Sequence, residues 1–166
     1  PRLFRVRATA GLEMTVVFID TSVLCNLLPV PGRDQDQKQV RAEMQKRFGA
    51  GEQFIIPITS VIETGNFIAQ LKDGEVRRDV AQKFHHLLRL IIDGKAPWVL
   101  HDIAWNSKFL RLLLEGADTE IPYVDHSTAG LGMGDLCILA ERCHYQQRLG
   151  LRAEIWTRDA QLSAHR

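Results

Sequence analysis

The sequence predicts one α/β domain, in which helices flank a twisted parallel β-sheet. Short apolar segments rich in β-branched residues alternate with longer segments of helical periodicity, which is the order expected of βαβ units. The first segment, residues 15–19, is apolar throughout, as is typical of a strand buried on both faces of a parallel sheet. No repeat or linker divides the chain. We therefore expect a single domain over residues 14–166, with residues 1–13 as an added or disordered leader.

The first half of the chain is predicted to contain two strands and four helices. After the first strand, three consecutive capping residues begin a helix that ends near residue 28, where two prolines follow. An exposed helix over 34–49 has apolar residues at every fourth position. A second strand over 53–57 leads into a helix over 59–71, and the segment 74–92 is a long amphipathic helix.

The second half is less regular. Its predicted elements are a strand over 98–101, helices over 104–114 and 135–149, a strand over 154–157 and a final turn from Asp159. Residues 115–134 are polar, contain several glycines and show neither the helical nor the strand period, so no element is predicted there.

Composition limits the functional classes. The formal net charge of +1 excludes a protein whose overall charge coats nucleic acid, so any anion binding must come from a local patch. The three cysteines form no CxxC pair and are expected to be reduced core or helix residues of a cytoplasmic protein. No apolar run approaches the roughly 18 residues that a membrane span needs, so no membrane partner is expected.

Four acidic residues lie at the edges of apolar segments. Asp20 and Asp159 follow predicted strands, Glu63 lies one turn into a helix that follows a strand, and Asp135 opens a helix. Because ligands of open α/β sheets bind beyond the carboxyl ends of the strands, we expect these side chains to converge. Converging carboxylates repel one another, and a hard divalent cation is the simplest way to neutralise them.

The segments around these acids resemble, in order, the acidic motifs of the PIN-domain family. FIDTSVL at 18–24 resembles its opening strand and turn, and TSVIE at 59–63 resembles its second acidic helix. GDLCILA at 134–140 resembles its third motif, and IWTRD at 155–159 is similar to its final strand, with a hydroxyl residue two positions before an aspartate. The family usually continues into a further strand, whereas this chain stops at Arg166, so a compact variant or a fragment is expected.

The resemblance implies an endoribonuclease that depends on Mg²⁺ or Mn²⁺ and cleaves single-stranded or looped RNA. A carboxylate-held cation activates water and neutralises charge on the transferring phosphorus. The resemblance assigns catalysis and metal binding to Asp20, Glu63, Asp135 and Asp159, and hydrogen-bonding support to Ser22 and Thr157. Arg158, beside this site, is expected to contact a substrate phosphate. Small family members are often toxins, so an antitoxin protein and a homodimer are expected partners.

Each residue also has a structural interpretation. Asp20, Asp135 and Asp159 are suitable N-caps, and Glu63 would be an ordinary exposed helical glutamate. The glycines at 130–134 match no nucleotide-binding motif. They form either a flexible turn or a loop that lets backbone N–H groups approach an RNA phosphate.

Two other functions remain open from sequence. The first is a non-catalytic PIN-like module that binds RNA or a protein, although this chain keeps all four acids. The second is a metal-dependent phosphatase, but residues 20–22 lack the second aspartate of a DxDxT motif. The basic side chains of residues 77–89 form either a solvated helix face or an RNA path. The six histidines show no zinc spacing and are expected to be structural.

Overall fold

A four-stranded parallel sheet forms the centre of the protein. The computed structural model describes residues 15–95, 98–101 and 103–165, so the expected leader at 1–13 lies outside the described residues. The strands are β1 (Val16–Ile19), β2 (Gln53–Ile56), β3 (Trp98–Leu100) and β4 (Ala153–Trp156), in the order β3-β2-β1-β4. All three pairings are parallel. The predicted α/β fold class is therefore confirmed.

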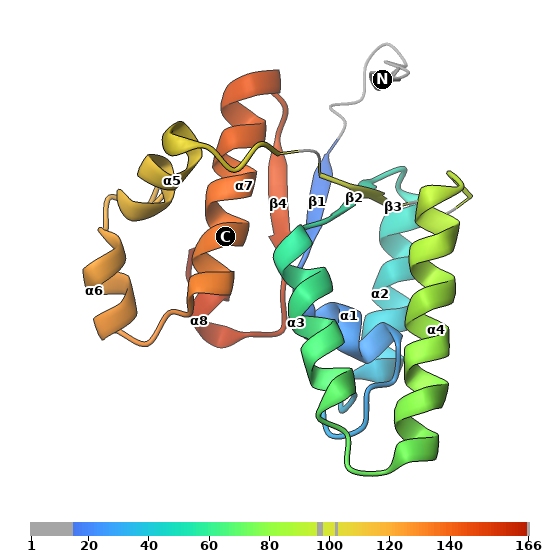
Figure 1. Cartoon of the computed structure of the whole chain (residues 1–166). Coiled ribbons are helices and arrows are strands. Elements are labelled where there is room, and N and C mark those ends of the chain that lie inside the picture. The colour runs from blue at the N-terminus through green and yellow to red at the C-terminus, as the bar shows by residue number, and fades with distance from the viewer. Residues whose placement is uncertain (1–14, 96–97, 102, 166) are drawn as a thin grey trace.

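Helices cover both faces of this sheet (Figure 1). The described chain contains α1 (Thr21–Leu27), α2 (Gln37–Gly49), α3 (Ile58–Ala69), α4 (Gly74–Ile92), α5 (Ser107–Leu114), α6 (Tyr123–Thr128), α7 (Met133–Leu149) and α8 (Ala160–Ser163). The core on one face is formed with α1 to α4, and the core on the other face is formed with α5, α7 and α8.

The central strand β1 explains both cores. All four of its residues are fully buried. Val17 and Ile19 pack into the first core, whereas Val16 and Phe18 pack into the second, because successive side chains of a strand point to opposite faces. A continuous apolar run is therefore required at this position.

In the second half of the chain the structure corrects the starts of two predicted helices and adds a helix that was not predicted. Helix α5 begins at Ser107 rather than at 104. The side chain of Asn106 caps it there by accepting hydrogen bonds from the backbone N–H groups of residues 108 and 109. The unassigned segment 115–134 contains α6. Helix α7 begins at Met133 with Gly132 as its N-cap, so Asp135 is the third helical residue and not its cap. The predicted flexible turn at 130–134 is therefore wrong for its last two residues, which are helical.

None of the helices in the described ranges combines the length and apolarity needed to cross a membrane.

Candidate functional site

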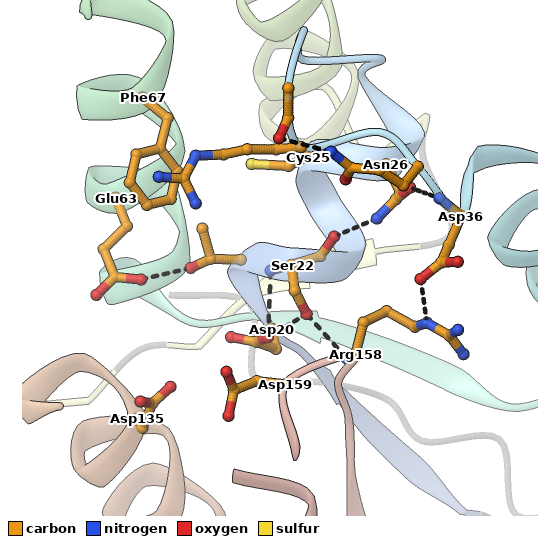
Figure 2. A pocket seen from close by; sticks show the side chains of 14 residues that line it. Asp20, Ser22, Cys25, Asn26, Asp36, Glu63, Phe67, Asp135, Arg158 and Asp159 are labelled. Carbon is orange, nitrogen blue, oxygen red and sulfur yellow. Dashed lines mark hydrogen bonds and ion pairs between the residues drawn. The ribbon is translucent and has the colours of Figure 1, made fainter. Parts of the chain in front are cut away.

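A cleft of about 350 Å³ lies beyond the carboxyl ends of β1 and β4. Side chains from four separate parts of the chain surround it (Figure 2). Its lining consists of Asp20, Thr21, Ser22, Cys25, Asn26, Gly32, Arg33, Gln35, Asp36, Glu63, Phe67, Asp135, Arg158 and Asp159. All four predicted acids are thus brought to one cleft, as parallel strands and their following helices would place them.

Asp20 is the most firmly held of the four acids. It follows β1, is only 3% exposed and caps α1. Its Oδ2 accepts hydrogen bonds from the Ser22 backbone N–H at 3.1 Å, from the Ser22 hydroxyl and from the Thr157 hydroxyl at 2.8 Å. Within the described part of the chain no hydrogen bond reaches Oδ1, so this oxygen is available to a ligand. The sequence-predicted supporting residues Ser22 and Thr157 therefore do contact Asp20.

Asp159 lies beside Asp20 because β1 and β4 are adjacent, with Ile19 and Trp156 in register. The backbone N–H of Asp159 donates to the Thr157 hydroxyl at 2.8 Å. Its Oδ1 accepts hydrogen bonds from the backbone N–H groups of Gln161 and Leu162 in α8, at 2.8 and 3.0 Å. The capping interpretation is thus correct, yet the residue also lines the cleft, and the cap does not use its Oδ2.

Glu63 enters the cleft from α3 and touches α7. The Thr21 hydroxyl donates to its Oε2 at 2.7 Å. Its other oxygen, Oε1, lies directly against Gly134, where a Cβ would come within 2.9 Å of the Glu63 Cδ and closer still to Oε1. Gly134 is therefore needed to give the Glu63 carboxylate its space.

Asp135 shows that the four acids share one electrostatic environment. The pKa of its carboxyl is raised from the usual 3.8 to about 6, first by burial and then by the negative charges of Asp20, Asp159 and Glu63. A backbone hydrogen bond from Gly132 opposes this rise. As the third residue of α7, Asp135 can reach back to the N-cap in this way.

The carboxylates of the cleft are the type of ligand that a hard divalent cation prefers, but they are not arranged around one point. Mg²⁺, Mn²⁺ and Ca²⁺ prefer carboxylate and other oxygen ligands, which the cleft supplies. Among the residues that the structure describes, however, no three His, Cys, Asp or Glu side chains are positioned together to hold one ion. A cation would have to draw the carboxylates closer, against hydrogen bonds that already hold one oxygen each of Asp20, Glu63 and Asp159.

Two arginines stand at the cleft. Arg158, which was predicted to contact substrate, lines the cleft but donates to Asp36 at 2.9 Å and to Gln39 at 3.3 Å. Arg33 lies over the ring of Phe67, with its guanidinium carbon 3.4 Å from the ring centroid. The Phe67 ring and Arg158 lie on opposite sides of α1 in Figure 2.

Sequence reasoning missed several residues in the cleft lining or beside it. Thr21 was interpreted only as a capping residue, and Gly134 as part of a flexible turn or of a loop that approaches an RNA phosphate. The contact between Arg33 and Phe67 left no signal, because these residues are far apart in sequence. The spacing of Glu63 and Phe67, four residues apart on one predicted helix, could have shown that they share a face.

The cysteines and the histidines His101 and His126 are not candidates for catalysis. Burial raises the pKa of the Cys25 thiol to about 11, so this lining residue is not a thiolate nucleophile at neutral pH. All three cysteines are buried, helical and free, as predicted. His101 contacts the buried Glu141 at 3.0 Å and His126 contacts Thr119 at 2.7 Å, which are structural roles.

No family model, curated protein or solved structure matches this chain. The assignment of a function therefore depends on the residues themselves.

Proposed function

We propose that the protein is an endoribonuclease that depends on Mg²⁺ or Mn²⁺ and hydrolyses phosphodiester bonds of single-stranded or looped RNA. The observation that carries the proposal is the meeting of Asp20, Glu63, Asp135 and Asp159 at one cleft, where burial and then the charges of the other three raise the pKa of Asp135. Four carboxylates that line one cleft repel one another, and a bound cation would offset this repulsion. The likeness of the surrounding segments to PIN-domain motifs adds support.

The chain's own residues prepare the chemistry. A cation held there would activate water and neutralise charge on the phosphate. Asp20 is fixed by three donors to its Oδ2, which leaves Oδ1 in a defined direction. Glu63 is held between Thr21 and Gly134. These contacts orient two of the carboxylates that would hold the cation.

Cleavage of a labelled single-stranded RNA pool with Mg²⁺, Mn²⁺ or EDTA tests the proposal. The wild type should cut only with metal. Asp135→Asn should abolish cutting, because it removes one ionisable ligand but keeps the size of the side chain. Asp79→Asn is the matched control, since Asp79 pairs with Lys83 on the surface of α4, away from the cleft lining. Metal-independent cutting, or equal loss in both variants, would refute the assignment.

The toxin role is a further part of this proposal. A small nuclease domain with an open acidic cleft would be held inactive by an antitoxin protein and would act in the cytoplasm, as a homodimer. Expression of the nuclease alone should stop cell growth, and co-expression of a candidate antitoxin that restores growth would support this role. Growth unaffected by the nuclease would argue against it.

A second candidate is a non-catalytic module that binds RNA or a protein. The observation in its favour is that no three acids in the described segments are positioned to hold one ion. Calorimetry separates the two functions, because a binding module should take up RNA equally well with EDTA and with Mn²⁺.

A further inference from the structure

Arg33 is held in place by an aromatic ring rather than by an acid. It follows α1 in the loop before α2, and its guanidinium lies over the Phe67 ring at 3.4 Å. An arginine at this distance from an aromatic face is attracted by the ring quadrupole, and its planar fork is pre-organised for an oxyanion. Phe67 lies four residues after Glu63 on α3, about 6 Å along the helix axis.

The hydrogen-bonding capacity of this arginine is unused. Within residues 15–95, 98–101 and 103–165, no carboxylate forms an ion pair with Arg33 and no hydrogen bond from its guanidinium is found, whereas Arg158 on the same cleft is paired with Asp36. An arginine carries five N–H donors. Arg33 therefore presents a fixed positive charge with free N–H donors to the cleft that Asp20, Glu63, Asp135 and Asp159 also line.

The negative charge of the cleft explains why an arginine without an ion pair matters for binding RNA. Its lining contains five carboxylates and two arginines, a formal charge of −3 when all are ionised. Such a cleft repels a nucleic-acid strand even when one divalent cation is bound. Because Asp36 occupies Arg158, Arg33 is the lining cation that can attract a phosphate without first breaking an ion pair.

We propose that Arg33, supported by Phe67, binds a backbone phosphate of the RNA strand next to the phosphate that reacts. This inference rests on the proposed function and adds a binding residue to it. Arg33 does not take part in the chemical step. It fixes the strand along α3, so that the neighbouring phosphate meets Asp20, Glu63, Asp135 and Asp159.

Fluorescence anisotropy of a labelled single-stranded RNA of about 12 nucleotides tests this role. The titrations are made in Ca²⁺, a hard cation that carboxylates accept, over a series of KCl concentrations, and a gel verifies that the RNA stays intact. Arg33→Gln should weaken binding about tenfold. It should also lower the slope of log affinity against log salt by about 0.7, the value for one phosphate contact on a single strand.

Two further variants sharpen the test. Arg33→Lys should keep the salt slope but bind several-fold more weakly, because an ammonium loses the planar stacking on Phe67. Arg148→Gln, in the exposed last turn of α7 and outside the cleft lining, is the matched control and should behave as the wild type. The proposal is overturned if the wild type binds no RNA, or if Arg33→Gln leaves both affinity and slope unchanged. A lowered slope without any metal-dependent cleavage would refute the nuclease and leave the phosphate contact standing.

Discussion

Gly134→Ala should separate activity from stability. In the first turn of α7 an alanine would improve helix propensity by about 0.5 to 1 kcal/mol. Its Cβ would, however, enter the space of the Glu63 carboxylate. The carboxylate is the far end of a flexible side chain and can withdraw by about 1 Å, giving up the hydrogen bond from Thr21, which contributes about 1 kcal/mol. These two effects nearly cancel, so the free energy of unfolding should change by less than about 1 kcal/mol.

The activity should respond much more strongly. A displacement of about 1 Å in a catalytic group costs about 10²-fold in rate, so Gly134→Ala should lower RNA cleavage in Mn²⁺ by about that factor. Gly65→Ala is the matched control on α3, because its Cβ would meet only Phe84 at an ordinary 3.9 Å. It should cleave normally. Full activity in Gly134→Ala, or unfolding in place of a rate loss, would refute the inference that this glycine makes room for Glu63.

Three other outcomes follow from the site. Because the folded pKa of Asp135 is about 6 against a usual 3.8, the folded state binds more protons between these values, and the metal-free protein should lose up to about 3 kcal/mol of stability as pH rises from about 4 to above 6. Asp135→Asn should remove most of this loss in urea titrations across that pH range, and an unchanged pH profile would contradict the shifted pKa. At metal concentrations well below saturation, cleavage should fall as pH drops through about 6, since protons compete with the cation for Asp135; a rate that is flat from pH 5 to 7 under these conditions would exclude Asp135 as a metal ligand. Thr21→Val should destabilise the protein by about 1 kcal/mol and lower cleavage through the freed Glu63, whereas a loss of stability with normal cleavage would make Thr21 purely structural.

The regular parts of the fold were predictable because their signals are local. The fully buried run at β1 and the amphipathic face of α4 define their elements directly. The predictions failed where a boundary depends on a single cap. Asn106 caps α5, and Gly132 caps α7, which begins at Met133, two residues before the predicted start at Asp135. Helix α6 lies in a polar segment and is only six residues long. It is too short to show the helical period of apolar residues.

The acids of the site were predictable for a related reason. Strand ends of a parallel sheet meet at one edge, so Asp20 and Asp159 could be placed together from their strands alone. The surroundings of Glu63 were not predictable, because its neighbours Thr21 and Gly134 come from α1 and α7. Likewise, no local pattern shows that Asp36 pairs with Arg158 while Arg33 lies on Phe67. Such contacts are set by how helices pack.

The most direct test of the account is a calorimetric titration of the protein with Mn²⁺ at pH 7.5. The account predicts saturable binding by the wild type and at least about tenfold weaker binding by Asp135→Asn, with Asp79→Asn unchanged. In a second titration at pH 6, binding should also release about half a proton, because Asp135 has a pKa of about 6 and is about half protonated at that pH. No binding by the wild type, or equal affinity in all three proteins, would contradict the claim that the four carboxylates of this cleft hold a divalent cation.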